Sequence, residues 1–288
     1  MKNSILFLAF AAILMFVGCS KDNRDEVSPE KGKRLITLRA TVDEPGTRLS
    51  VNGSGKFSWQ LDDYIIVFKE SNGSYCETDL SHALNDGPTG DFEVYLDEDE
   101  TISYAMYPAS KYSEFDAANN TLLFGLDERY DYVAGSSYMP MLGSDITVED
   151  EYYYIKASFK AVGGVLKVTL NNVPQDEDEL IGKLVFTVPG KKITGQFPIK
   201  EDSDGVKYIE TENYEGTDQI EIENNMGYSG DSNRSMDFYI PLPCGTYNNM
   251  EFTWVDMYDN LILSKTAKID GGLTVHRNEI ITAPALNL

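Results

Sequence analysis

Hydrophobic and polar residues alternate along several short segments of the chain, and the first clear case lies near residue 40. Hydrophobic side chains stand at every second position and polar ones between them: Ile36, Leu38, Ala40 and Val42 against Thr37, Arg39 and Thr41. A period of two is typical of a β-strand with one buried face, because successive side chains in a strand point to opposite sides. Residues 35–42 are therefore predicted to form a half-buried strand.

Short runs of similar character recur along most of the chain. They predict further strands at residues 57–60, 64–68, 92–96, 102–107, 152–159, 165–170, 184–188, 220–222, 236–242, 252–255 and 261–264. Turn-forming residues separate them, among them Asn72-Gly73, Asp204-Gly205 and Asp270-Gly271-Gly272. No segment shows an apolar stripe of helical period and length. The sequence therefore predicts an all-β protein built from β-sandwich domains with Greek-key connections.

The length of the chain indicates two such domains. At about 150 residues per domain, 288 residues correspond to roughly two. An acidic segment, Glu149-Asp150-Glu151, precedes a new series of strands and marks the division. We expect an N-terminal β-sandwich over residues 34–151 and a C-terminal β-sandwich over residues 152–288.

The first nineteen residues are typical of a bacterial lipoprotein signal. Lys2 precedes thirteen apolar residues, Ile5 to Val17, which are too few to span a bilayer that requires about 20. Phe16-Val17-Gly18-Cys19 resembles the lipobox, although Leu is commoner where Phe16 stands. Residues 1–18 are thus predicted to be removed, leaving an acylated Cys19 that anchors the protein to the membrane. The alternative is cleavage at Gly18 or earlier, with Cys19 left as a free thiol.

Residues 19–33 and the overall charge complete the picture of an anchored surface protein. Beyond Cys19 this segment is rich in charged residues, Ser, Pro and Gly and predicts a flexible tether. With 24 Lys and Arg against 47 Asp and Glu, the net charge is −23, which repels nucleic acids. No nucleic-acid partner is expected, and attachment to the membrane would depend on the lipid.

Candidate chemistry is sparse. The chain has two histidines, His82 and His276, and neither stands in a zinc-binding motif. Acidic runs such as residues 97–100 and 176–179 lack the pattern of a calcium loop, and no nucleophile elbow, P-loop or dinucleotide motif is present. We therefore expect no metal, no cofactor and no enzymatic activity, and a hydrolase is the least favoured class.

The one suggestion of a ligand site is the aromatic cluster Tyr152-Tyr153-Tyr154. In a strand only Tyr152 and Tyr154 share a face, where they could stack on a sugar. Cross-strand packing is the simpler interpretation, since tyrosine is a strong strand former.

Several motifs together resemble the fimbrillin (Mfa-like, major fimbrial subunit) family of anaerobic Gram-negative bacteria. After Thr47-Arg48, the residues Trp59, Asp63, Ile65, Val67 and Phe68 match a W-x-x-x-D-x-I-x-V-F pattern. Ala105-Met106-Tyr107-Pro108 is similar to the A-x-Y-P signature of the family, and residues 138–141 and 159–168 resemble later landmarks. Asp62 departs from the pattern, in which glycine is commoner.

The resemblance implies two tandem transthyretin-like β-sandwiches in an outer-membrane, cell-surface lipoprotein of a fimbria (pilus). It also implies trimming by an arginine-specific protease, after which a strand from another fimbrial subunit fills the groove by β-augmentation. The candidate cleavage residues are Arg34, before the first strand, and Arg48, after it. Cleavage at Arg34 would leave the strand attached and cleavage at Arg48 would release it, and we favour Arg34 because the basic tether is exposed.

Two points stay open at this level. Residues 278–288 alternate in character and are either a donor strand or the last strand of the second domain, with Pro284 tolerable only at a sheet edge. The alternative function is a surface lipoprotein that captures glycans for nutrient uptake, and adhesion to host or bacterial glycans or proteins is compatible with both.

Overall fold

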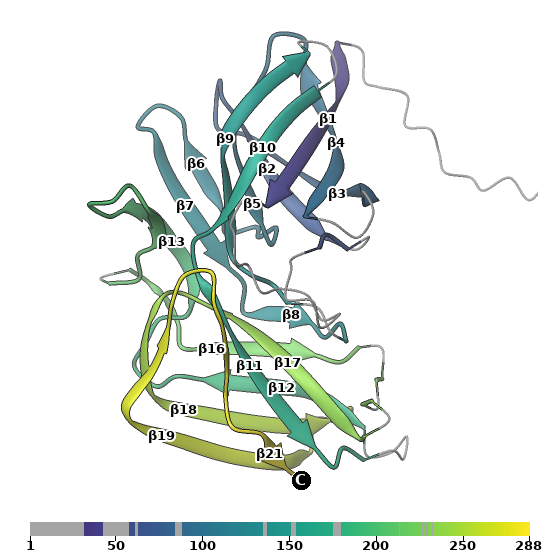
Figure 1. Cartoon of the computed structure of the whole chain (residues 1–288), viewed down its shortest axis with the longest axis vertical. Coiled ribbons are helices and arrows are strands. Elements are labelled where there is room, and N and C mark those ends of the chain that lie inside the picture. The colour runs from purple at the N-terminus through teal and green to yellow at the C-terminus, as the bar shows by residue number, and fades with distance from the viewer. Residues whose placement is uncertain are drawn as a thin grey trace, which may run out of the picture.

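The structure is a computed structural model, and it describes residues 32–42, 58–60, 63–83, 88–134, 137–150, 154–174, 180–212, 214–225, 227–228, 230–231 and 233–288. Every regular element within these residues is a β-strand, from β1 to β21 (Figure 1). The all-β prediction is confirmed. Among the residues described, no helix has the length and hydrophobicity needed to cross a membrane.

Seven strands close into a barrel in the upper part of the molecule (Figure 1). In order around the barrel they are β1 (Lys33–Val42), β10 (Tyr154–Ala161), β9 (Met141–Asp150), β5 (Ile102–Tyr107), β2 (Tyr64–Lys69), β3 (Tyr75–Ala83) and β4 (Thr89–Asp97). The barrel interior is filled by a cluster of buried residues that includes Leu38, Trp59, Phe92 and Phe159.

Two sheets form a sandwich in the lower part (Figure 1). One sheet has the order β17 (Ser235–Leu242), β11 (Gly164–Asn171), β20 (Ile280–Thr282), with β21 (Leu286–Asn287) also paired to β11. The other has the order β19 (Leu261–Val275), β18 (Gly245–Asp256), β12 (Ile181–Thr187), β16 (Gln219–Glu223), β8 (Arg129–Asp131). The second large core lies between these sheets and includes Phe186, Phe238 and Trp254.

A smaller sheet joins the two halves of the chain. Its order is β14 (Lys207–Ile209), β13 (Thr194–Glu201), β7 (Thr121–Leu126), β6 (Glu114–Asp116), and β15 (Gly216–Thr217) also pairs with β13. A third core cluster, which includes Phe124 and Phe197, packs this sheet against the outside of the barrel.

The continuous hydrophobic run in β2 follows from this arrangement. Ile65 and Val67 point into the barrel, whereas Ile66 and Phe68 belong to the cluster outside it. All four side chains are fully buried. A strand covered on both faces loses the alternation of hydrophobic and polar residues that marks a half-buried strand.

Strand pairing runs across the predicted domain boundary in both directions. β10 follows residue 151 in sequence but belongs to the barrel, whereas β8 precedes it but pairs with β16. The chain passes from barrel to sandwich at Gly163-Gly164, where a Cβ on Gly163 would lie 2.7 Å from the carbonyl oxygen of Leu242. Residues 151–153 lie outside the described residues, and the division into 34–151 and 152–288 stays a prediction.

The structure differs from two local predictions. Residues 58–60 are not a strand, although Trp59 is buried in the barrel core. The predicted turn at residues 270–272 is instead an irregularity inside β19, which continues to Val275 with Gly271 and Gly272 at positive φ. By contrast, the turn with Asn72-Gly73 forms between β2 and β3, and Asp204-Gly205 forms the β13–β14 turn.

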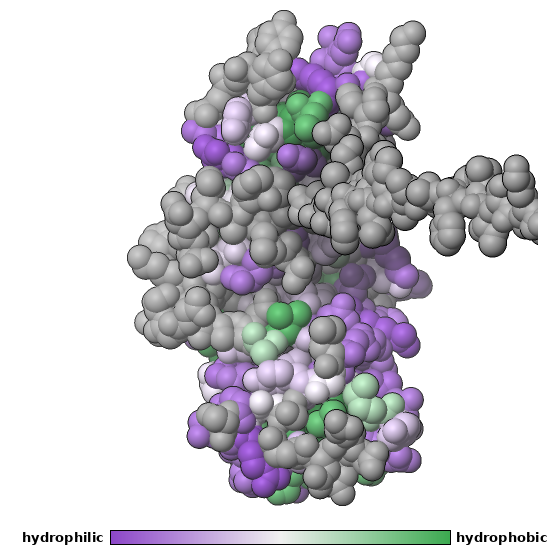
Figure 2. Space-filling view, turned by 90° about the vertical axis from the view of Figure 1, so that its right-hand side faces the viewer, coloured by the Kyte–Doolittle hydropathy of each residue, from purple (hydrophilic) through white to green (hydrophobic). Residues whose placement is uncertain are grey.

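The surface shows little continuous apolar area where it can be seen. On the face drawn in Figure 2, the coloured residues are mostly hydrophilic and the hydrophobic ones form small separate patches. Scattered exposed hydrophobic residues are normal for a folded protein and indicate no docking surface by themselves.

Candidate functional site: the strand that closes the barrel

Strand β1 is the first described strand and fills the position between β4 and β10. It pairs antiparallel with β4 from Lys33 to Thr41 and parallel with β10 from Thr37 to Val42. Figure 1 shows it as the purple arrow between these two neighbours. Both edges of β1 are therefore hydrogen bonded, and without it β4 and β10 would each have a free edge.

The inward face of β1 is the one that the sequence predicts. Ile36, Leu38, Ala40 and Val42 are 2%, 0%, 0% and 7% exposed and belong to the barrel core. Burial of one leucine or isoleucine side chain contributes about 1.5–3 kcal/mol. The hydrophobic face therefore holds β1 in place more strongly than its surface contacts do.

On the outward face, Arg39 makes the principal polar contact between β1 and β4. Its Nε and Nη2 atoms donate to Oδ1 and Oδ2 of Asp91 at 2.8 and 2.9 Å. The guanidinium carbon also lies 5.2 Å from the ring centroid of Tyr154 at the start of β10. Asp91 is buried and the Arg39 side chain is 32% exposed, so this two-pronged ion pair is largely shielded from solvent and fixes the register across β4, β1 and β10.

Arg34 lies inside β1, next to its first residue, and not in the tether before it. Its backbone pairs with Leu96 of β4, and its Nη2 atom donates to the carbonyl oxygen of Glu100 at 2.9 Å. The carboxylate of Glu100 in turn accepts from the backbone N–H and the hydroxyl of Ser71. The side chain of Arg34 is thus tied to the loop between β4 and β5.

The motifs that resemble fimbrillins meet in one buried cluster beneath β1. The indole of Trp59 makes edge-to-face contacts with Tyr107, Phe92 and Phe159 at centroid distances of 5.3, 5.1 and 5.4 Å. The hydroxyl of Tyr107 donates to Oδ1 of Asp63 at 2.7 Å, and the N–H of Gln60 donates to Oδ2 at 2.7 Å. Burial, together with the charge of Asp63, raises the pKa of Tyr107 well above its ordinary value.

This cluster explains why the two motifs occur together. Asp63 holds the irregular segment that carries Trp59, and Tyr107 joins that segment to β5. A buried hydrogen bond to a charged group contributes about 1.5–3 kcal/mol. The cluster is part of the barrel core that β1 covers, so its role is structural.

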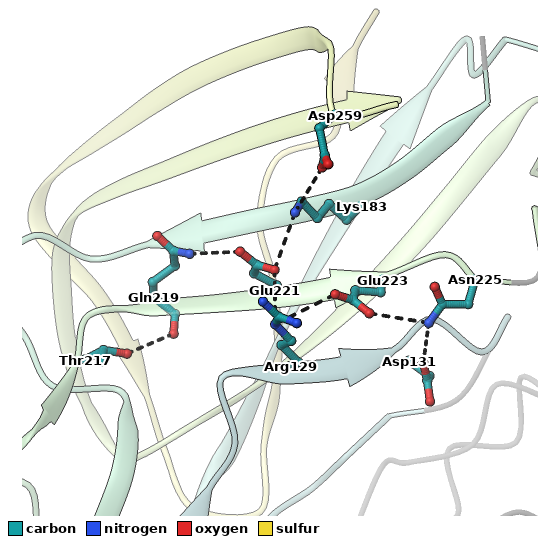
Figure 3. Close-up of polar contacts among 9 residues, drawn as sticks. All are labelled: Arg129, Asp131, Lys183, Thr217, Gln219, Glu221, Glu223, Asn225 and Asp259. Carbon is teal, nitrogen blue, oxygen red and sulfur yellow. Dashed lines mark hydrogen bonds and ion pairs between the residues drawn. The ribbon is translucent and has the colours of Figure 1, made fainter. Parts of the chain in front are cut away.

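A second polar network lies on the outer face of the sandwich and ties β8 to β16 (Figure 3). Arg129 of β8 lies 3.5 Å from Glu221 and 3.8 Å from Glu223, which alternate on β16. Lys183 of β12 lies 3.6 Å from Glu221 and 3.1 Å from Asp259. The hydrogen bond to Asp259 and the charge of Glu221 raise the pKa of Lys183.

The network of ion pairs links three strands, β8, β16 and β12, and the turn between β18 and β19. Asn225 extends it, because its Nδ2 atom donates to Asp131 of β8 at 2.8 Å and to Glu223 at 3.4 Å (Figure 3). Its effect is to hold the short strand β8, which comes from the first half of the chain, on a sheet built by the second half. The sequence contained no signal for it, since three residues are too few for a recognisable period.

The structure describes only some of the predicted site residues. Cys19, Arg48 and Tyr152 lie outside the described residues, as do the predicted signal peptide and nearly all of the tether. Tyr154 is 37% exposed at the start of β10, and Arg39 covers one face of its ring. A sugar-stacking role for Tyr152 and Tyr154 stays a prediction.

The structure contains no cluster suited to a metal ion within its described part. No group of three or more His, Cys, Asp or Glu side chains that could hold a metal is found there. His276 is exposed beyond the end of β19. Cys244 is a half-buried free thiol, and burial raises its pKa to about 11.

Comparisons with known proteins give structural likenesses of limited extent. No family model matches the chain, and no curated protein matches it in sequence. Among solved structures, it is similar to a proposed cell adhesion protein from Bacteroides uniformis, with 12% sequence identity and a TM-score of 0.42 over 88% of this chain and 93% of that one. It is also similar to a proposed cell adhesion protein from Bacteroides ovatus, with 11% identity and a TM-score of 0.44 over 88% of this chain and 92% of that one. A third similar structure is the tip fimbrial protein Mfa3 from Porphyromonas gingivalis, with 10% identity and a TM-score of 0.31 over 82% of this chain and 81% of that one.

Proposed function

We propose that the chain is a surface-anchored fimbrial subunit or fimbrillin-like adhesin that assembles by donor-strand β-augmentation after N-terminal trimming. The observation that supports this is the position of β1: the first described strand closes the barrel between β4 and β10. Because β1 precedes every other described strand, it can leave without another described strand having to move. The motif resemblance to fimbrillins points to the same class of protein.

Loss of β1 would create a groove ready for another strand. The groove would have the backbone edges of β4 and β10 as its walls and the barrel core, with Trp59 and Phe92, as its floor. Unpaired backbone groups beside apolar surface favour the addition of a strand, since an incoming strand satisfies both. An incoming strand would need small or aliphatic residues at alternate positions to replace Ile36, Leu38, Ala40 and Val42.

The trimming site that permits exchange is, in this proposal, Arg48. Cleavage after Arg34 would leave residues 35–42 joined to the barrel, and Arg34 itself is engaged by the backbone of Leu96 and by Glu100. Arg48 stands between β1 and Trp59 in sequence, so cleavage there cuts the connection of β1 to the rest of the barrel. Both arginines remain candidates, but they have different consequences for β1.

The C-terminal segment is a candidate donor. β20 and β21 lie parallel to β11 at a sheet edge, paired over three and two residues respectively, and Pro284 falls in the interruption between them. Ile280, Ile281, Leu286 and Leu288 are only partly buried against the cores. A strand with so few backbone pairs can detach at low free energy compared with β1.

Anchoring at the outer membrane completes the proposal. Before trimming separates the segment that carries it, an acylated Cys19 would hold this acidic protein at a surface that its charge does not favour. Other fimbrial subunits would be its partners, and no enzymatic role is part of the proposal. Globomycin, which blocks lipoprotein signal peptidase, should cause a heavier precursor to accumulate, and an unchanged mass would argue against acylation.

The test of assembly uses residues 20–288 without the lipid and an arginine-specific protease. Trimming is followed by N-terminal sequencing, and assembly is followed by light scattering and electron microscopy. We expect oligomers or filaments from the wild type and from Arg34→Gln, and none from Arg48→Gln. Assembly by Arg48→Gln at the wild-type rate, or trimmed protein that stays monomeric at high concentration, would contradict the proposal.

A further inference from the structure

A cleft lies where the barrel meets the small sheet formed by β6, β7, β13 and β14. Its volume is about 270 Å³, and its lining comes from five elements: β5, the β6–β7 turn with β7, β9, β13 and β14. Leu122 and Leu142 are among the apolar residues of the lining, and Tyr104, Asn120, Lys200 and Lys207 are among the polar ones.

The cleft exists because Pro198 ends the pairing between β7 and β13. The register runs from Gly195 opposite Leu126 to Pro198 opposite Leu123 and stops there. Proline has no N–H to donate, so it interrupts a ladder of hydrogen bonds. Beyond it β13 pairs with β14 alone, through Ile199, Lys200 and Glu201, and the space next to β7 is left open.

An aromatic ring stands in the cleft and is held in place. Tyr104 packs edge-to-face against Phe115 with centroids 4.9 Å apart, and its hydroxyl lies 3.5 Å from Oδ1 of Asn120. The Nζ atom of Lys207 lies 6.0 Å from the ring centroid. The cleft therefore presents a fixed ring, an amide and an ammonium group next to one another.

The charge of the lining is opposite to that of the chain. Lys200 and Lys207 contribute two ammonium groups and Glu201 one carboxylate, whereas the whole chain carries −23. Neither lysine takes part in an ion pair within the described part of the chain. Lys207 lies over the ring of Tyr104, and neither ammonium group is neutralised by a carboxylate among the described residues, so the two lysines together attract an anionic group of a ligand.

We propose that this cleft binds an acidic sugar, a single pyranose ring that carries a carboxylate. The ring of the sugar packs on Tyr104 and the apolar lining, its carboxylate pairs with Lys200 and Lys207, and its hydroxyl groups bond to Asn120 and neighbouring polar groups. The volume lies just below the roughly 300–1,000 Å³ of pockets for drug-sized ligands, which suits one ring better than an oligosaccharide chain. The site goes beyond the proposed assembly, because it is complete without any change in β1.

The test is ligand-observed NMR on the untrimmed, full-length chain purified in detergent. D-glucuronate is titrated against D-glucose, which lacks the carboxylate, and against acetate, which lacks the ring. We expect saturable binding of glucuronate in the millimolar range and binding at least tenfold weaker for both glucose and acetate. Equal binding of glucose, equal binding of acetate, or no binding of glucuronate would overturn the proposal.

Variants locate the site. The double variant Lys200→Gln and Lys207→Gln should weaken glucuronate binding at least fivefold, and Tyr104→Ala should abolish it. Lys265→Gln, which removes an exposed lysine of β19, is the matched control and should bind as the wild type does. If Tyr104→Ala does not fold, the double lysine variant alone tests the site. Glucuronate binding by that variant as strong as in the wild type would refute the site. Trimming and assembly are measured separately, so failure here leaves the proposed assembly untouched.

Discussion

Replacement of Leu38 by alanine tests whether β1 is an integral part of the barrel core. The side chain is fully buried among the barrel cluster, so its truncation leaves a cavity beneath the middle of β1. Leu→Ala changes in cores destabilise by about 2–5 kcal/mol, against total stabilities of about 5–15 kcal/mol. A chain of 150–250 residues loses about 2–4 °C per kcal/mol and a longer chain somewhat less, so we expect the melting temperature to fall by a few degrees.

Hydrogen exchange separates the local effect from the global one. Opening of β1 alone exposes the amides of β1 and of its neighbours β4 and β10. A loss of about 2 kcal/mol should accelerate exchange of these amides roughly 30-fold in Leu38→Ala. Amides of β12 and β18 in the sandwich should be affected less.

The matched control for Leu38→Ala is a substitution at the preceding residue, Thr37. Thr37 is half-buried and points outward from β1, so Thr37→Val keeps the β-branched shape and should change stability by no more than about 0.5 kcal/mol. The reasoning would be refuted if Leu38→Ala were as stable as the wild type, or if Thr37→Val were equally damaging.

Three further predictions concern other buried groups. Tyr107→Phe removes the hydrogen bond to Asp63 and should lower the free energy of unfolding, measured by urea titration, by about 1.5–3 kcal/mol. An unchanged free energy of unfolding would mean that this hydrogen bond does not stabilise the protein. Asn224→Ala removes the side-chain hydrogen bonds to Ile181 and Tyr228 and should lower the free energy of unfolding by at least about 2 kcal/mol, whereas Asn249→Ala, at an exposed asparagine of β18, should stay close to wild type as the control. Burial raises the pKa of Cys244 to about 11, so its alkylation at pH 8.5 should be about a hundredfold slower in the native protein than in the unfolded protein. Mass spectrometry follows the reaction, and equal rates in the two states would mean that the native protein exposes a reactive thiolate.

The sequence predicted many of the strands that alternate or are uniformly hydrophobic, although it missed the hydrophobic strand β7. β1 shows the expected inward face from Ile36 to Val42, and β5 matches the predicted range of residues 102–107. These elements have their own local signal, because each buries a face along its whole length. The motif residues Trp59, Asp63 and Tyr107 were also identified from sequence, although their mutual contacts were not.

The remaining features depend on contacts between distant segments. β8 has only three residues and is a strand because β16 pairs with it. No strand was predicted at β13, which becomes a strand through its pairing with β7 and β14. Trp59 resembles a strand residue in sequence but is held in an irregular segment by Asp63. Closure of the barrel by β1 and the cleft beside Pro198 follow from the three-dimensional order of strands, which no local pattern encodes.

Exchange of β1 after a single cut is the most direct test of its proposed role. Protein cut at Arg48 is mixed with an isotopically heavy peptide of residues 33–42, and native mass spectrometry follows replacement of the light strand, with uncut protein as the reference. The account predicts that the heavy peptide enters the cut protein, does not enter the uncut protein, and suppresses oligomer formation as it does so. Oligomers that form while the light β1 stays bound, or entry of the peptide without any cut, would contradict it.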